Sequence, residues 1–417
     1  MTTAELREKA IQIENWLDAH FVDQNGAVYT LIDQASLRPA QETLFHDAGA
    51  RKGVGDFSVD GYERSELAAY ENCGMCTGAY MQALLYQYRV EHNRETLKKV
   101  RRCFTALKRI FEMGKQLEPG FFPKIYGNRF SYQTSTDQVL YAVMAMDHFD
   151  EFASSSEKAE IDLMIPLMIN FWVKRNYQYT YFHLKDMQWP LIRFPALLLL
   201  ACKHSQDAVF KDEYKRLLAQ GFTMAPEFAQ LKEKQAGKVK PCEYEKKHNA
   251  WLVVNMADCI TMDVMELDYL LSNDPGNPLA RTWKNSLMTM WNEAKITLAP
   301  DGKYYSQVLV DMKTGEVRRT PGYQQGDRDY HGAKSGWSSM IARAAVTVAK
   351  YYPPDDAILA SVSNVLNFLD VNDFTYYDEP ERFSPEFRFN TRFLSGDAIA
   401  NWLWAYWQDR FQNIPNH

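Results

Sequence analysis

The chain has 417 residues, which is enough for one large domain or for two or three ordinary ones. Apolar residues make up 46% of it and aromatic residues 14%, so it can bury a substantial core. The 47 basic and 53 acidic residues give a net charge of −6 without a basic stripe, which argues against a nucleic-acid-binding protein.

The sequence shows no signal for secretion or membrane insertion. Its start, MTTAELREKAIQIENW, lacks the basic and apolar regions of a signal peptide. The longest aliphatic run, residues 195–202, is too short to cross a bilayer. We therefore expect a cytoplasmic protein that binds neither membranes nor nucleic acid.

The stretch 66–91 predicts a buried helix, after an amphipathic helix over residues 4–21 and a long polar segment. No charged residue occurs between Glu71 and Arg89, and a helix that is apolar all round packs on all sides. A glycine such as Gly78 costs about 1 kcal/mol relative to alanine inside a helix. Its presence indicates that a neighbouring helix approaches closely there.

The rest of the chain repeats this alternation of amphipathic and buried helices. Helices with one wet face are predicted over residues 95–113, 154–174, 206–219, 278–298 and 355–369. Mostly buried helices are predicted over residues 136–152, 189–204, 248–271, 331–351 and 394–411. Two segments differ, a charged loop at 232–240 and a β-hairpin within 304–319 whose turn is Lys-Thr-Gly.

The lengths of the connections indicate how these helices are arranged. A link that follows a buried helix has only a few residues, whereas links that precede buried helices are mostly long, polar and aromatic. Helices with short links pack antiparallel, so the long loops would share one rim with the N-termini of the inner helices. Helix dipoles and free N–H groups at that rim favour anionic ligands. The prediction is a single all-α domain over residues 1–417, an (α/α)6 toroid of six helical hairpins with a minor β-hairpin.

Two predicted inner-helix starts carry a family resemblance. Residues 71–80 read ENCGMCTGAY and continue to YQYRV at 86–90, while residues 134–141 read TSTDQVLY. With these segments and its helical hairpins, the chain resembles the six-hairpin glycosidase-like superfamily, nearest in pattern to unsaturated glucuronyl and rhamnogalacturonyl hydrolases. The resemblance implies a glycoside hydrolase. At the first acidic position those hydrolases have Asp, where this chain has Glu71-Asn72.

The candidate catalytic residues are Asp137, Glu71 and His331. Asp137 opens the second inner helix, where an acid can also simply complement the helix dipole. Two carboxylates across a sugar suit glycoside hydrolysis, because one donates a proton while the other activates water or attacks. His331 ends an Asp-Arg-Asp-Tyr-His run, which suits proton transfer or substrate orientation.

The candidate substrate-binding residues precede or open the predicted inner helices on the same rim. Arg388 and Arg392 carry guanidinium groups, which pair bidentately with carboxylates such as that of a uronate. Aromatic side chains there can stack on sugar rings. The full set is Asn72, Gln138, Trp189, His248, Asn249, Asp329, Tyr330, Trp337, Arg388 and Arg392.

The six cysteines include a CxxC pair, Cys73 and Cys76, inside the predicted buried helix. A metal half-site or a redox pair is one interpretation, and small buried thiols are the other. No second CxxC, metal-ligand spacing, phosphate loop or nucleophile elbow occurs. We therefore predict six thiols, no metal and no cofactor.

Three functions are compatible with these patterns. The first is a glycoside hydrolase that releases a terminal uronic acid, saturated or unsaturated, from short oligosaccharides. The second is a uronate lyase or sugar epimerase that moves protons with Tyr330 and His331, or with His248. The third is a non-catalytic carbohydrate-binding protein. The sequence does not indicate an oligomeric state.

Overall fold

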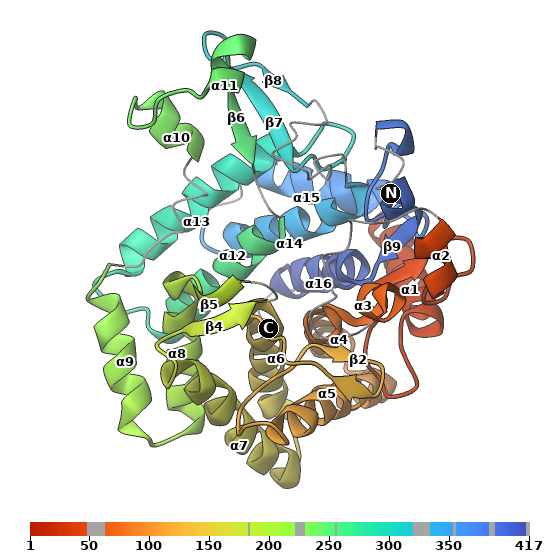
Figure 1. Ribbon diagram of the computed structural model, residues 1–417, viewed down its shortest axis with the longest axis vertical. Coiled ribbons are helices and arrows are strands. Elements are labelled where there is room, and N and C mark those ends of the chain that lie inside the picture. Colours follow the sequence, from red (N-terminus) through yellow and green to blue (C-terminus); the bar gives the residue numbers. More distant parts are fainter. Residues whose placement is uncertain are drawn as a thin grey trace.

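The computed structural model describes residues 1–47, 63–181, 184–221, 230–254, 257–319, 334–352, 356–382 and 388–413. Within them the chain consists mainly of helices in two concentric rings, with only small sheets (Figure 1). The predicted all-α toroid is confirmed.

The inner ring of the described chain consists of six helices that start at the same end of the molecule. They are α4 (Cys73–Glu91), α6 (Thr136–Phe149), α8 (Phe194–His204), α12 (Ala257–Asn273), α14 (Ser338–Ala349) and α16 (Gly396–Gln412). Each packs against the next, and α16 packs against α4, so the ring is closed. Their side chains supply much of the main hydrophobic core.

The outer ring covers this core with the amphipathic helices. They are α1 (Thr3–His20), α5 (Arg94–Lys115), α7 (Ser155–Val173), α9 (Ala208–Leu218), α13 (Ala280–Ala294) and α15 (Asp356–Phe368). Each packs on the inner helix before it, except α1, which packs on α16. The same closure joins two short antiparallel strands, β1 (Leu31–Asp33) and β9 (Phe393–Ser395).

Smaller elements occupy the long connections on the rim where the inner helices start. They are α2 (Glu42–Asp47), α3 (Arg64–Tyr70), β2 (Ile125–Tyr126), β3 (Arg129–Phe130), β4 (Gln178–Tyr181), β5 (Leu184–Gln188), α10 (Gln230–Gln235) and α11 (Glu243–His248). No described helix is both long enough and apolar enough to traverse a bilayer.

The predicted helix 66–91 is divided in the structure. The helix α3 ends at Tyr70 with Glu71 as its C-cap, and α4 begins after Asn72, whose backbone (φ −110°, ψ 21°) is not helical. The Asn72 N–H donates to Thr30 Oγ at 2.7 Å instead of continuing a helical ladder. The break places Glu71 and Asn72 at the mouth of the ring rather than inside a helix.

The predicted helix 248–271 also begins too early. Residues Ala250–Val254 form β6, which pairs antiparallel with β7 (Gln307–Asp311), and β7 pairs with β8 (Val317–Arg318). The run Trp-Leu-Val-Val favours a strand because aromatic and β-branched side chains pack well on a pleated surface. The predicted hairpin is thus confirmed, but it belongs to a three-stranded sheet that projects from the ring together with α10 and α11 (Figure 1).

The remaining differences between the predicted and the observed elements involve only short segments. The helices α8, α14 and α16 start later than predicted, because Leu191–Arg193 and Ser335–Trp337 form 3-10 turns and Phe393–Ser395 is a strand. The charged segment at 232–240 is partly helical rather than a loop. Its Lys234 contacts Glu245 of α11 at 2.7 Å, and this ion pair holds α10 beside α11.

Gly78 of α4 faces the backbone of α6, as its position in a buried helix predicted. A Cβ at Gly78 would lie 2.6 Å from the carbonyl oxygen of Tyr141. We expect Gly78→Ala to lower stability by about 1–3 kcal/mol, the usual range for overpacking a core, because the α6 backbone must shift. Thermal unfolding measures this. Gly276→Ala is the control, since its Cβ meets nothing within 4 Å, and equal melting temperatures for the two variants would contradict the prediction.

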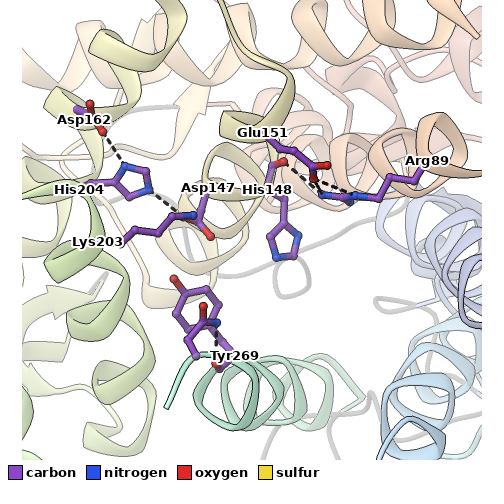
Figure 2. A network of polar contacts seen from close by, with 9 residues as sticks. Arg89, Asp147, His148, Glu151, Asp162, Lys203, His204 and Tyr269 are labelled. Carbon is purple, nitrogen blue, oxygen red and sulfur yellow. Dashed lines mark hydrogen bonds and ion pairs between the residues drawn. The ribbon is translucent and has the colours of Figure 1, made fainter. Parts of the chain in front are cut away.

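The opposite ends of the inner helices are joined by a charged network (Figure 2). His204 of α8 lies between Asp147 of α6 and Asp162 of α7, with Nε2 and Nδ1 each 2.8 Å from a carboxylate oxygen. Carboxylates only accept hydrogen bonds, so both ring nitrogens carry a proton and the ring is charged. Burial opposes this charge, but the hydrogen bonds to Asp147 and Asp162 outweigh it and raise the pKa of His204.

This network predicts a pH-dependent contribution to stability. With a raised folded pKa, the contribution of His204 is complete below about pH 6.5, the unfolded value, and is lost as pH rises through the folded value. His204→Gln should therefore lower the Tm more at about pH 6 than at about pH 9. Equal Tm losses at the two pH values would contradict the charged state of His204.

His148, in the last turn of α6, provides a control of opposite sign. Burial lowers the pKa of His148 to about 4, and its Nδ1 lies 2.7 Å from Gln82 Oε1. A lowered pKa gives stability that is present above the unfolded pKa and is lost as pH falls. His148→Gln should therefore lower the Tm more at about pH 9 than at about pH 6.

Candidate active site

Four carboxyl groups from different parts of the sequence converge where the inner helices begin. Glu71 lies two residues before the first residue of α4, and Asp137, Asp258 and Asp397 are the second residues of α6, α12 and α16. We call these four side chains the acid cluster. Burial, together with the charges of the other three members and against the opposing Cys76 hydrogen bond, raises the pKa of Asp397 to about 8. The cluster is therefore one electrostatic unit.

The members of the acid cluster differ in access and in surroundings. Asp397 is buried, and Cys76 donates its thiol hydrogen to Asp397 Oδ1 at 2.8 Å. Asp258 is half-buried, its Oδ1 has no hydrogen-bond partner, and burial raises the pKa of its carboxyl. Glu71 and Asp137 both keep accessible surface. These last two can touch a ligand directly, whereas the Asp397 side chain is covered.

The Glu71–Asn72 junction is fixed by two buried donors. Lys124 Nζ lies 3.6 Å from Glu71 Oε1 and donates to the Glu71 carbonyl at 3.1 Å and to Asn72 Oδ1 at 3.2 Å. Gln138 Nε2 donates to the same carbonyl at 3.2 Å and to Asn72 Oδ1 at 3.1 Å. Gln138 follows Asp137 on α6, so these bonds set the position of Glu71 relative to Asp137.

Arg193 holds the start of α6 from the other side. It is buried, its Nη1 donates to Thr136 Oγ at 3.0 Å, and its Nε lies 3.5 Å from Asp263 Oδ1 on α12. Burial disfavours its charge, but Asp263 and further acids, Glu266 and Asp137 among them, raise the pKa of Arg193. One cation thus ties α6, α8 and α12 together beside Asp137.

Lys334 is buried just before the 3-10 turn that leads into α14, against three aromatic rings. Its Nζ lies 3.8 Å from the ring centre of Trp337, 4.3 Å from that of Tyr377 and 5.1 Å from that of Tyr376. We call these rings the aromatic cage. Burial lowers the pKa of Lys334 to about 7, although the charge of Asp258 opposes that shift.

Trp189 belongs to a second aromatic group near the acid cluster. It is buried and packs edge-on against Trp172 and Tyr181, with ring centres 5.6 Å and 5.4 Å apart. The Tyr181 ring lies 6.0 Å from Lys124 Nζ. Burial, followed by the charges of Glu71 and other cluster acids, raises the pKa of Tyr181. Trp189 therefore supports Tyr181, which is the side chain nearer the acids.

Four of the predicted binding residues lie elsewhere or have other partners. His248 and Asn249 are separated from α12 by the strand β6, and the His248 ring packs on Tyr244 with ring centres 4.4 Å apart. Arg392 Nη2 lies 3.1 Å from Asp33 Oδ1, and Arg388 Nε donates to the Pro380 carbonyl at 3.1 Å. Three more candidates fall outside the described residues, namely Asp329, Tyr330 and His331.

The structure adds five charged residues that the sequence patterns did not single out. They are Lys124, Arg193, Asp258, Lys334 and Asp397. An acid in the first turn of an inner helix is a signal that applies to Asp258 and Asp397 as well as to Asp137. Of the three cations, Lys124 and Lys334 lie in irregular segments and Arg193 lies in the 3-10 turn before α8, and no motif in the sequence marks any of them.

All six cysteines are free, and Cys73, Cys76 and Cys103 are buried. Burial raises the pKa of the Cys73 thiol to about 12, so Cys73 stays protonated at neutral pH. In the part of the chain that the structure describes, no three His, Cys, Asp or Glu side chains group as metal ligands.

Comparison with known proteins identifies the fold. No protein-family model and no curated protein matches the sequence. The structure is similar to a sugar epimerase from a ruminal bacterium, with 11% identity over 100% of both chains and a TM-score of 0.54. It is also similar to a cellobiose 2-epimerase from Bacillus thermoamylovorans, with 11% identity over 97% of this chain and 99% of that one and a TM-score of 0.54. A third similar structure is an unsaturated glucuronyl hydrolase specific for heparin, with 10% identity over 97% of this chain and 95% of that one and a TM-score of 0.54. The chain thus has the same (α/α)6 toroid fold as these three proteins.

Proposed function

We propose that the chain is a carbohydrate-processing enzyme that hydrolyses a glycosidic bond in short oligosaccharides. The observation that carries this proposal is the convergence of the acid cluster at one end of the ring. A non-catalytic binding protein would not need four mutually repelling carboxyl groups from separate helices in one place. Proteins of the same fold that are described as a sugar epimerase and as an unsaturated glucuronyl hydrolase make a sugar the natural substrate class.

Asp137 is the principal proton-transfer group in this proposal, and Glu71 is its partner carboxylate. Both side chains keep accessible surface, and the bonds from Lys124 and Gln138 fix one relative to the other. One of the two protonates the leaving oxygen, while the other activates water or attacks the sugar. Asp397, with a pKa of about 8, is neutral at pH 7, which reduces the repulsion between the remaining acids.

The lyase or epimerase alternative loses one of its proposed proton carriers. His248 lies at the far end of β6 from α12, where Tyr244 packs on its ring. Tyr330 and His331 lie outside the described residues. Glycoside hydrolysis is therefore the function that the described side chains support best.

The experiment that tests this function compares the products of the three reactions. The purified protein is incubated with an unsaturated uronate disaccharide, a saturated uronate oligosaccharide and cellobiose. A hydrolase separates the sugars and consumes the unsaturated disaccharide, with loss of its ultraviolet absorbance. A lyase creates that absorbance, and an epimerase changes the sugar without cleaving it, so either of these outcomes would reject hydrolysis.

A further inference from the structure

Lys334 is a buried cation whose neighbours do not neutralise its charge. Only 2% of the residue is exposed, and among the described residues its ammonium has no ion pair or hydrogen bond. The segment is held by its backbone, because the Lys334 N–H donates to the Tyr304 carbonyl at 2.9 Å and its carbonyl accepts from Trp337 at 3.0 Å. The ammonium is therefore fixed against the aromatic cage, where aromatic faces attract a cation but remove none of its charge.

A charge in this position is unfavourable without an anion. Burying an ammonium group without a paired carboxylate is energetically costly, so buried lysines are rarely left unpaired. Two charged groups approach from neighbouring segments. The charge of Asp258 on α12 favours the ammonium form of Lys334, but the two groups form no ion pair. Asp378 accepts hydrogen bonds from Ser335 and Thr375 instead. A ligand anion beside Lys334 would compensate the buried charge.

The other two cations that the structure describes near the acid cluster already have partners. Lys124 is bound to Glu71 and Asn72, and Arg193 to Thr136 and Asp263. Two atoms near Lys334 also lack partners, since neither Trp337 Nε1 nor Asp258 Oδ1 forms a hydrogen bond with any residue in the described ranges. A sugar that carries a carboxylate offers hydrogen-bond acceptors to the Trp337 N–H and hydroxyl donors to Asp258 Oδ1.

We propose that Lys334, held by the aromatic cage beside Asp258, is the group that selects a carboxylate-bearing sugar at this site. The inference rests on the proposed function for the identity of the site and adds the charge of its substrate. It assigns to Lys334 the role that sequence patterns gave to Arg388 and Arg392. A bound carboxylate would stabilise the ammonium form, so binding would take up a proton near neutral pH.

The test is a binding measurement with two sugars that differ only in charge. Isothermal titration of the full chain with methyl β-D-glucuronoside and methyl β-D-glucoside compares a carboxylate with a hydroxymethyl group on the same ring. At about pH 6 the wild type should bind the glucuronoside at least ~10-fold more tightly, and Lys334→Met should abolish this preference. The melting temperature of each variant checks its folding.

Lys334→Arg separates the role of the charge from that of the packing. Arginine stays protonated throughout the pH range, so the variant should keep its preference at about pH 8.5, where the wild type weakens as Lys334 loses its proton. Equal binding of the two sugars by the wild type, absence of binding, or an unchanged preference in Lys334→Met would overturn the inference. The measurement needs no turnover. If the protein hydrolyses an oligosaccharide but does not prefer the glucuronoside, the proposed function holds and the role of Lys334 is rejected. If it prefers the glucuronoside but hydrolyses nothing, the binding role of Lys334 holds and the proposed function is rejected.

Discussion

Asp137→Asn is expected to reduce kcat at least ~10²-fold on the oligosaccharide that the protein cleaves, the usual scale for losing general acid–base catalysis. The substitution keeps the shape of the side chain but removes the group that gives and takes the proton. Its position in the first turn of α6 is held by Gln138 and Thr136, whose contacts it leaves in place. Steady-state kinetics measure the loss, and an unchanged Tm shows that the fold is intact.

Two further variants make this result specific. Asp150→Asn changes an acid at the other end of α6 and should leave kcat within a factor of about two, because it lies roughly 20 Å along the helix from Asp137. Glu71→Gln should reduce kcat strongly as well. Near wild-type turnover in Asp137→Asn would reject its catalytic role, and activity that also survives Glu71→Gln would reject the carboxylate pair.

Arg193→Met is expected to produce the largest loss of stability, about 3–5 kcal/mol, the range for removing one partner of a buried ion pair. The substitution leaves Asp263 buried beside Glu266, whose carboxyl oxygens have no hydrogen-bond partner. It also frees Thr136 at the start of α6. Chemical denaturation with circular dichroism measures the change in the free energy of unfolding.

Arg392→Met is the matched control for that measurement. Arg392 pairs with Asp33 on the rim, but its side chain is 50% exposed. Ion pairs of exposed residues contribute at most about 1 kcal/mol, so this variant should remain close to wild type. If Arg193→Met is no less stable than Arg392→Met, the buried cation does not hold the three inner helices together.

The arrangement of helices could be predicted because burial leaves a strong pattern. A run such as 73–85 carries no charge, and the short links after buried helices reveal the hairpins. The break at Glu71-Asn72 could not be predicted, since it depends on a hydrogen bond to Thr30, a residue far away in the sequence. The same holds for β6, whose pairing partner β7 lies some fifty residues later.

The candidate site was predictable only where chemistry coincides with a helix start. Asp137 was found in this way, and Asp258 was missed because the start of its helix was predicted too early. Lys334 could not be found from the sequence. Its significance depends on Tyr376 and Tyr377, which approach it from another connection and supply no counter-charge.

The pairing of α1 with α16, and of β1 with β9, has a consequence for how the molecule unfolds. A linear array of helical repeats has two free ends, and it can fray from either end while the remainder stays folded. In a closed cycle every hairpin has two neighbours, so losing any one of them breaks two interfaces at once. The first and last described helices are therefore as integral as those in the middle, and deleting α1 would uncover the face of α16 on which it packs.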